Sequence, residues 1–326
     1  MSIKIIQGEC KEVLRTLPDK TFNTCVTSPP YWGLRDYEED KQLGLEETPE
    51  KYVANLVEVF KEVRRVLRDD GTVWLNLGDS YCSSRPMGSS GNSDKVGDAY
   101  KKHTESFDFG RTGKTLKVGS NKHRVRGKVA KGLKLKDLIG IPWRVAFALQ
   151  EDGWYLRQDI IWNKPNPMPE SVQDRCTKSH EYIFLLSKKD KYYYDNESIK
   201  EDCLEENKKD LNERMTYEEF HYDEVVTTDK KNKRSVWTVS TKSYKEAHFA
   251  TYPTDLIEPC ILAGCPKDGN VLDPFGGAGT TGLVSDRLGR NATLIELNKS
   301  YADIIEKRLR NDNSLFLDLE IENHES

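Results

Sequence analysis

Short apolar segments of strand length alternate with segments of helical periodicity along most of this chain, and this alternation restricts the fold more than any other feature. Residues 3–6 and 22–27 are predicted strands. Apolar residues then recur at helical spacing from Val53 to Leu67, behind a Thr48 N-cap, and Asp69-Asp70-Gly71 is expected to end that helix. Strands that alternate with helices form a mostly parallel sheet covered on both faces. The predicted fold class is therefore α/β.

Two stretches without this periodicity divide the chain of 326 residues. We expect one core in three parts, residues 1–80, 136–194 and 246–326. A long segment rich in Gly, Ser, Lys and Arg, residues 81–135, separates the first two parts, and an acidic, partly helical insertion, residues 195–245, separates the last two. Loops of this length within a compact domain are usually functional or disordered.

The two insertions carry opposite charges, although the net charge of the whole chain is only −4. From Arg85 to Lys136 there are fourteen Lys or Arg residues against four Asp or Glu residues. From Asp195 to Lys231 there are thirteen acidic residues against six basic ones. Basic side chains bind phosphates by displacing counterions, so the first insertion is the candidate for contact with nucleic acid. A solvated loop without such a contact is the alternative.

Membrane, secreted and metal-binding classes of protein find little support in the sequence. No apolar run reaches the length of a membrane span and the N-terminus lacks a signal-peptide pattern, which favours a cytoplasmic protein without a membrane partner. The seven cysteines are scattered without a Cys-x-x-Cys pair, and the six histidines show no i, i+4 pair. We therefore expect neither a metal site nor a disulfide framework.

A glycine-rich turn between a predicted strand and a predicted helix is the first candidate site. Its strand ends at Asp273, and the next strand ends at Glu296. Glycines let a ligand approach backbone amides, one carboxylate can face an ammonium group, and the other can hold both hydroxyls of a ribose. A nucleoside with an amino group is expected, and S-adenosylmethionine fits this description. The predicted cofactor-binding residues of this segment are Asp273, Phe275, Gly276, Gly277, Gly279, Thr280, Thr281 and Glu296.

The spacing of the glycines separates this turn from other nucleotide-binding loops. A dinucleotide site would need G-x-G-x-x-G, and a phosphate-binding P-loop would need Gly-Lys-Ser/Thr, and this turn matches neither pattern. A plain tight turn without a ligand is the structural alternative.

The second candidate site is the tetrapeptide Ser28-Pro29-Pro30-Tyr31, which directly follows a predicted strand. Ligands bind at the carboxyl ends of strands in open α/β sheets. Two consecutive prolines stiffen the backbone and remove two N–H donors. This leaves the Ser28 hydroxyl and the Pro29 carbonyl as acceptors for an amino group on a base, which Tyr31 could stack upon. A Pro-Pro turn with Tyr31 in the core is the structural alternative.

In type and order these two motifs resemble those of the amino-methyltransferases of DNA, in the β class whose motifs are circularly permuted. Ser-Pro-Pro-Tyr precedes Phe-x-Gly-x-Gly, as in that class. Residues 6–10 resemble a first-strand motif that reaches the cofactor adenine, with Glu9 where the family commonly has Asp. Residues 248–254 resemble a motif that helps to bind the methionine end of the cofactor, here through Pro253 and Thr254.

The resemblance implies a seven-stranded, mostly parallel Rossmann-like methyltransferase sheet. Residues 71–81 and 160–181 are also similar to family sequence. Residues 3–6 would form the third strand, beside a strand from the far end of the chain. Residues 1–80 would then be the catalytic half of the core and residues 246–326 the cofactor-binding half. The basic insertion would contact DNA, and the acidic one would be a small target-recognition or accessory element.

For the substrate, the resemblance favours the exocyclic N4 of cytosine, because Ser28 is similar to the first residue of cytosine-N4 enzymes. Adenine-N6 enzymes more often have Asp or Asn there, and adenine N6 is the alternative. A base within a duplex must be flipped out to reach such a site, so the expected partner is double-stranded DNA. Two rivals are an enzyme that methylates protein glutamine, whose Asn-Pro-Pro-Tyr follows the cofactor loop, and a nucleic-acid-binding protein without activity.

A covalent intermediate is not required, because proximity and orientation do most of the work in such a transfer. Cys260 follows a proline, as a ring-attacking cytosine methyltransferase nucleophile does, but it lies in an apolar helix beside Ile257 and Ile261 and is expected to be core. The alternation from Leu315 to Ile321 predicts an edge strand or part of a dimer contact. A homodimer and a companion restriction endonuclease on a separate chain stay open.

Overall fold

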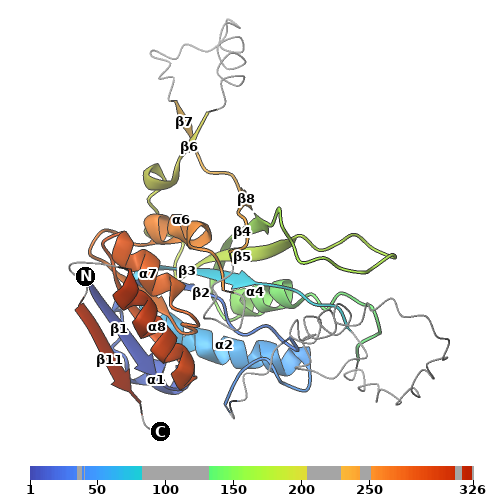
Figure 1. The fold of residues 1–326 in the computed structure, drawn as a ribbon, viewed down its shortest axis with the longest axis horizontal. Coiled ribbons are helices and arrows are strands. Elements are labelled where there is room, and N and C mark those ends of the chain that lie inside the picture. The colour runs from blue at the N-terminus through green and yellow to red at the C-terminus, as the bar shows by residue number, and fades with distance from the viewer. Residues whose placement is uncertain are drawn as a thin grey trace, which may run out of the picture.

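The computed structural model is built around one large sheet with helices on both faces (Figure 1). It describes residues 1–34, 39, 41–82, 132–203, 229–242, 251–312 and 318–324. The strands are β1 (Ser2–Gln7), β2 (Phe22–Thr27), β3 (Leu67–Leu77), β4 (Tyr155–Asn163), β5 (His180–Ser187), β6 (Glu201–Asp202), β7 (Lys230–Lys231), β8 (Val236–Thr238), β9 (Asn270–Asp273), β10 (Asn291–Glu296) and β11 (Asp318–Asn323). The helices are α1 (Cys10–Thr16), α2 (Pro49–Val66), α4 (Ile141–Glu151), α6 (Thr254–Gly264), α7 (Thr280–Arg287), α8 (Lys299–Asn311) and the short 3-10 helix η1 (Glu197–Ile199).

Among the described residues, nine strands form the main sheet, in the order β11-β1-β10-β9-β2-β3-β5-β4-β8. Most neighbouring strands are parallel, but β5 runs antiparallel to both β3 and β4. The predicted α/β class with a mostly parallel sheet is confirmed. The implied number of seven strands is wrong, because β11 and β8 add a strand at each edge.

The first strand of the chain pairs with strands from its C-terminal end. β1 is parallel to β10, with Ile5 opposite Leu294, and parallel to β11, with Ile5 opposite Ile321. Figure 1 shows both termini on this side of the molecule. The prediction that residues 3–6 lie beside a strand from the far end of the chain is confirmed, and so is the predicted edge strand of the tail.

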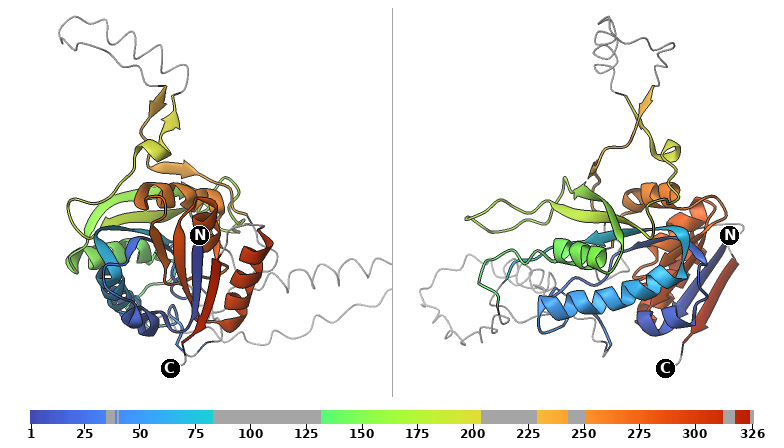
Figure 2. Two further views of the ribbon diagram at one scale, coloured as in Figure 1. Left: turned by 90° about the vertical axis from the view of Figure 1, so that its left-hand side faces the viewer. Right: turned by 180° about the vertical axis from the view of Figure 1, so that it is seen from behind.

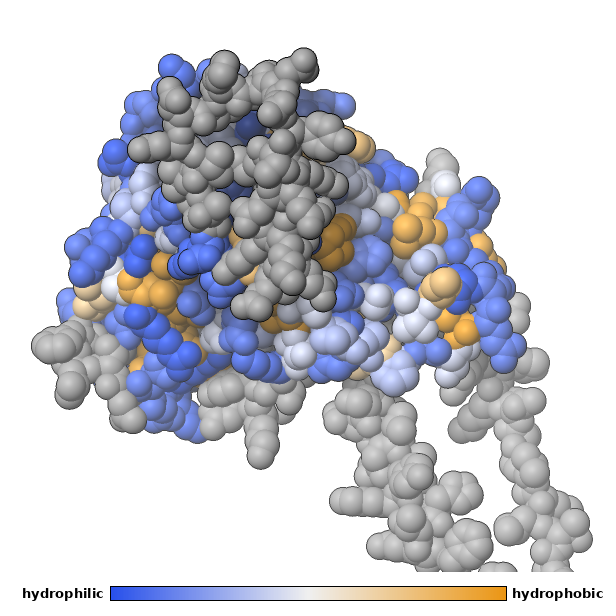
Figure 3. All heavy atoms as spheres, turned by 90° about the horizontal axis from the view of Figure 1, so that it is seen from above, coloured by the Kyte–Doolittle hydropathy of each residue, from blue (hydrophilic) through white to orange (hydrophobic). Residues whose placement is uncertain are grey.

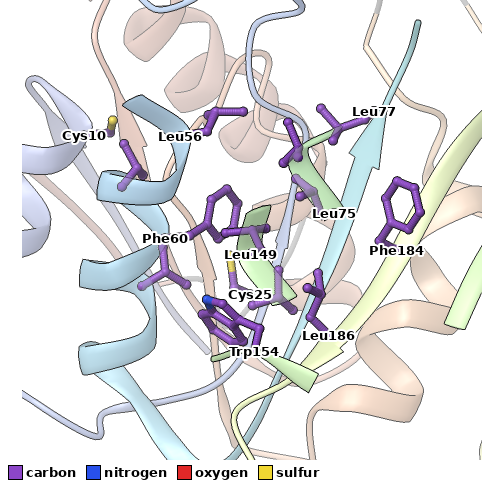
Figure 4. Close-up of a cluster of buried hydrophobic side chains, with 14 of the residues drawn as sticks. Cys10, Cys25, Leu56, Phe60, Leu75, Leu77, Leu149, Trp154, Phe184 and Leu186 are labelled. Carbon is purple, nitrogen blue, oxygen red and sulfur yellow. The ribbon is translucent and has the colours of Figure 1, made fainter. Parts of the chain in front are cut away.

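The two faces of the sheet bury two separate apolar cores. Along β2, Cys25 belongs to one core and its neighbour Val26 to the other, because successive side chains of a strand point to opposite faces. α1, α2 and α4 pack over the Cys25 side, and α6, α7 and α8 pack over the Val26 side (Figure 2). Figure 4 shows Phe60 of α2 and Leu149 of α4 gathered around Cys25.

Helix α2 begins where the sequence predicts and ends earlier. The Thr48 side chain accepts a hydrogen bond of 3.3 Å from the backbone N–H of Lys51, and proline occupies the first helical position. The helix ends at Val66, because Leu67 is already extended (φ −71°, ψ 144°) and pairs with Phe22 of β2. The prediction that Asp69-Asp70-Gly71 ends the helix is wrong, since these residues lie within β3.

The two insertions are described to different extents. Nearly all of the basic insertion lies outside the described residues. The described ends of the acidic insertion form the two-stranded β6–β7 ladder, with Glu201 opposite Lys231, which projects from the core (Figures 1 and 2). Seen from above, the surface is mostly hydrophilic with small, separate hydrophobic patches (Figure 3). No helix in the described part of the chain is both long and apolar enough to cross a membrane.

Candidate active site

The carboxyl ends of three neighbouring parallel strands bring the two predicted motifs to one edge of the sheet. β9 pairs with β2 on one side and with β10 on the other. β2 runs directly into Ser28, β9 ends at Asp273 and β10 ends at Glu296. The Thr27 hydroxyl donates a hydrogen bond of 2.6 Å to Asp273 Oδ1, across a sequence separation of 246. The tetrapeptide and the glycine turn are therefore adjacent at the edge where open α/β sheets bind ligands.

Asp273 has no exposed surface, and its carboxylate is engaged within the protein. It accepts hydrogen bonds from the hydroxyls of Thr27, Tyr252 and Thr281 and from the backbone N–H of Phe275. Burial raises the pKa of this carboxyl, and these donors oppose the rise. The sequence predicted that Asp273 faces the ammonium group of a ligand. In the structure it instead ties the tetrapeptide strand to the glycine turn, and a contact with ligand stays a prediction.

The glycine turn combines a left-handed backbone with open space. Gly277 has φ 52° and Gly279 has φ 75°. A Cβ on Gly279 would lie 2.7 Å from Cγ2 of Ile305 in α8, so both the conformation and the packing require glycine there. A Cβ on Gly277 would lie no closer than 3.8 Å to any described atom outside its neighbours, the nearest being the Phe275 carbonyl oxygen. The turn therefore leaves room for a ligand against its backbone.

Glu296 lies beside this turn, with its carboxylate held by backbone donors. Gly277 N–H donates to Oε2 at 2.7 Å, and Asn298 N–H donates to Oε1 at 2.9 Å. Burial raises the pKa of Glu296 to about 7, and the two backbone donors limit that rise. The side chain is only partly buried. The site thus contains a fixed carboxyl group that changes charge near neutral pH.

Glu9 lies at the same edge, because the Gly8 N–H donates to the Glu296 carbonyl at 2.9 Å. Its side chain accepts from the backbone N–H groups of Lys11 and Glu12 at 3.1 and 2.8 Å, and so caps the start of α1. A carboxylate in this place stabilises the helix whether or not a ligand is bound, so its contact with the cofactor stays a prediction.

Pro253, Thr254 and Thr280 lie at the starts of two helices that pack over the Val26 side of the sheet. Pro253 and Thr254 begin α6, directly after Tyr252, whose hydroxyl donates to Asp273 at 3.0 Å. Thr280 begins α7, and its hydroxyl accepts from Arg308 at 3.0 Å. Residues 248–250 of the same predicted motif lie outside the described residues. Both helix starts are therefore tied to the glycine turn, and the contact of these residues with a ligand stays a prediction.

The tetrapeptide is held from two sides. The Tyr52 hydroxyl of α2 donates to the Pro30 carbonyl at 2.8 Å. The Ser28 hydroxyl lies 3.4 Å from the Tyr31 hydroxyl, so these two side chains point to the same place. A Cβ on Gly78 would lie 2.5 Å from Cε2 of Tyr31, so the ring packs directly against the backbone after β3. The side chains of Ser28 and Tyr31 are partly buried.

The Tyr31 hydroxyl contacts a polar network of Asn76, Glu181 and Lys164, to which the sequence analysis assigned no role. The Tyr31 hydroxyl donates to Glu181 Oε2 at 2.8 Å and lies 3.1 Å from Asn76 Oδ1. Lys164 pairs with Glu181, and each of these two side chains is 17% exposed. Burial and the Glu181 charge raise the pKa of Tyr31, so the phenol stays protonated. A signal for this network in the sequence is Asn76, a polar residue within the otherwise apolar run Val73–Leu77.

Cys260 lies in α6 with no exposed surface, as the sequence predicted for a core residue. Burial raises the pKa of its thiol far above neutrality. A thiol that is closed to solvent and protonated is not a nucleophile.

A family model described as DNA methylase matches residues 22–307 of this chain. The type II methyltransferase M.SmaI of Serratia marcescens is 47% identical over 311 residues, which cover 94% of this chain and 91% of that protein. The type II methyltransferase M.Cfr9I of Citrobacter freundii is 46% identical over 310 residues, which cover 95% of this chain and 88% of that protein.

Solved structures share the fold at low sequence identity. The PvuII DNA methyltransferase (cytosine-N4-specific) superposes with a TM-score of 0.62 at 18% identity, over 96% of this chain and 89% of that chain. A putative DNA modification methylase of Thermus thermophilus, solved in complex with S-adenosyl-L-methionine, superposes with a TM-score of 0.58 at 20% identity, over 99% of this chain and 100% of that chain.

Proposed function

Since the chain belongs to the DNA methylase family, we propose that it transfers a methyl group from S-adenosylmethionine to the exocyclic N4 of cytosine in double-stranded DNA. The observation that carries this proposal is the hydrogen bond between Thr27 and Asp273, which places Ser28-Pro29-Pro30-Tyr31 beside the glycine turn. A methyl donor held by the turn and an amino group held by the tetrapeptide would meet there. Such an approach of two reactants supplies much of the rate enhancement of a transfer reaction.

The residues at the sheet edge fit the cofactor. The space beside Gly277 and the fixed carboxylate of Glu296 suit a nucleoside, with Glu296 toward the ribose hydroxyls. We assign Glu9 to the adenine end and Pro253 and Thr254 to the methionine end. When bound, the cofactor supplies a methyl group on a positively charged sulfur.

The tetrapeptide positions the target nitrogen. The Ser28 hydroxyl and the Pro29 carbonyl each accept a hydrogen bond from the amino group, which turns the nitrogen lone pair toward the methyl group. The nitrogen lone pair would form the new N–C bond while the C–S electron pair stays on the sulfur as a neutral thioether. The proton lost from the cationic nitrogen would pass along the hydrogen bond to the Ser28 hydroxyl and from there to water. Tyr31, fixed at its hydroxyl by Glu181, stacks on the flipped base.

The partners follow from the same proposal. The basic insertion, residues 81–135, would contact DNA phosphates, and its charge supports this. A companion restriction endonuclease on a separate chain is part of the proposal, because M.SmaI and M.Cfr9I are type II methyltransferases. The homodimer, the cytoplasmic location and the accessory role of residues 195–245 stay predictions.

The methylated base identifies the reaction. Mass spectrometry of DNA treated with the purified protein should find N4-methylcytosine, and Cys260→Ser should keep this activity because the buried thiol takes no part. N6-methyladenine as the sole product would reverse the assignment of the base and keep the mechanism. C5-methylcytosine that disappears in Cys260→Ser would overturn the mechanism itself.

Cofactor affinity should depend on pH through Glu296. If the ribose hydroxyls donate to the ionised carboxylate, affinity should fall by about tenfold for each pH unit below the pKa of about 7. The folding stability of the unliganded protein should depend on pH in the opposite direction and rise as pH falls. The contribution of a raised carboxyl pKa to folding is fully present below the ordinary value of 4.5 and is lost as pH rises through 7.

Calorimetric titration from pH 5.5 to 8.5, with thermal unfolding of the unliganded protein over the same range, measures both trends. Glu296→Gln is the matched control, since an amide does not titrate. If the cofactor affinity of the wild-type protein varies with pH in the same way as that of Glu296→Gln, the ribose does not bind at Glu296.

A further inference from the structure

The connection between β4 and β5 is a loop at the same edge of the sheet as the tetrapeptide. Asn163 pairs with His180 at the end of the β4–β5 ladder, and Leu77 at the end of β3 pairs with Tyr182. Because β3 is parallel to β2, residues 164–179 leave the sheet at the edge where β2 runs into Ser28, from strands that lie two and three positions away from β2. The green hairpin that projects beyond the sheet in Figure 1, and in the rear view of Figure 2, is this loop.

This loop carries an exposed apolar side chain, Met168, between two prolines. Met168 is 83% exposed, the highest value among the exposed large hydrophobic residues of the described chain. Pro167 and Pro169 restrict the backbone on both sides of it. A single exposed apolar residue is common on proteins, so exposure alone assigns Met168 no role.

The loop is braced rather than loose. Glu170 accepts from both terminal nitrogens of Arg175, at 2.8 and 3.1 Å, and from the Lys178 backbone N–H at 3.0 Å. The Arg175 guanidinium lies 3.8 Å from the ring centroid of Tyr81. The Lys178 ammonium group donates to the Asp79 carbonyl at 3.0 Å. These contacts fix the loop against the segment that follows β3, while the Met168 side chain is left in solvent.

The base of the loop is also joined to the tetrapeptide. Lys164 begins the loop and pairs with Glu181, which accepts the hydrogen bond of the Tyr31 hydroxyl. The side chain proposed to stack on the target base and the loop that carries Met168 are therefore fixed to one network.

We infer that Met168 is a wedge that enters the DNA base stack where the flipped base has left it, an inference that rests on the proposed function. Methionine and proline are among the apolar residues that proteins insert between base steps. The unbranched methionine side chain adapts to irregular gaps, and its sulfur contacts aromatic rings favourably. An apolar group in the vacated space offsets the stacking lost when the base leaves the helix.

The test compares two duplexes that share a site which the wild-type protein methylates. In one duplex the target base is paired, and in the other it faces an abasic nucleotide. Met168→Ala should lower the methylation rate on the paired duplex by about tenfold or more, and by less than about twofold on the unpaired one, because an unpaired base flips at little cost. Met168→Leu should retain most of the rate on both.

Ile321→Ala is the matched control, because Ile321 is also exposed, at 42%, but lies on β11 at the other end of the sheet. It should methylate both duplexes at the wild-type rate. Equal losses on both duplexes in Met168→Ala, or no loss on either, would overturn the wedge. A failure of the proposed function would appear separately, as a wild-type protein whose product is not N4-methylcytosine.

Discussion

Replacement of Tyr31 by alanine should lower the rate of DNA methylation by about 100-fold, because stacking worth roughly 1–3 kcal/mol is lost together with the fixed orientation of the target base. Cofactor affinity should be nearly unchanged, since the glycine turn and Glu296 make no hydrogen bond to Tyr31 among the described contacts. Single-turnover methylation and calorimetric titration of the cofactor measure the two effects separately.

Tyr31→Phe separates the ring from its hydroxyl. The ring and its stacking remain, so most of the methylation rate should remain. The free energy of unfolding should fall by about 1–3 kcal/mol, because Glu181 loses a hydrogen-bond donor in a partly buried place. If Tyr31→Ala methylates at the wild-type rate, the Tyr31 ring does not stack on the base. If Tyr31→Ala loses much of its cofactor affinity, the Tyr31 ring belongs to the cofactor site.

Much of the fold could be predicted because local signals and the order of the motifs agree. Thr48 and Pro49 mark the start of α2, and the alternation in the tail marks β11. The position of β1 between β10 and β11 could not come from local pattern, since any apolar strand could occupy it. It came from the resemblance to a family with permuted motifs.

The errors in the predicted fold have identifiable causes. Asp69-Asp70-Gly71 has the composition of a turn, but the pairing of Leu67 with Phe22 extends the backbone before those residues. β8 is short, Val236–Thr238, and pairs with Trp162 and its neighbours at the edge of β4. Tertiary pairing of this kind leaves little trace in a local sequence pattern.

The candidate site shows the same limit. Sequence reasoning predicted site residues from their chemical type, such as Ser28, Tyr31 and Glu296, and the structure places these three at one edge of the sheet. It did not assign a role to Glu181, which reaches Tyr31 across a sequence separation of 150. It also did not predict the hydrogen bonds that Asp273 accepts from Thr27 and Tyr252, which lie 246 and 21 residues away in the sequence.

Asp273→Ala should therefore have the largest effect on stability of any change in the site. Three hydroxyls and one backbone N–H would lose this acceptor. The hydroxyls of Tyr252 and Thr281 would keep the bond to each other, whereas Thr27 and the Phe275 N–H would lose an acceptor in the interior, and each buried group left unsatisfied costs about 1–3 kcal/mol. Removal of a buried carboxylate with a raised pKa recovers part of this sum. We expect the free energy of unfolding to fall by about 2–5 kcal/mol and cofactor affinity to be lost with the geometry of the turn, as chemical denaturation and calorimetry would measure.

Asp273→Asn distinguishes a residue that organises the turn from one that binds the cofactor through its charge. The amide oxygen can still accept from Thr27 and from the Phe275 N–H, and the amide nitrogen can donate to the hydroxyls of Tyr252 and Thr281, which also act as acceptors. The fold should then be largely retained. If Asp273 acts only by organising the turn, cofactor affinity should also be largely retained. A folded Asn variant that has lost cofactor binding would instead show that the carboxylate turns toward the ammonium group of the ligand, as the sequence first predicted.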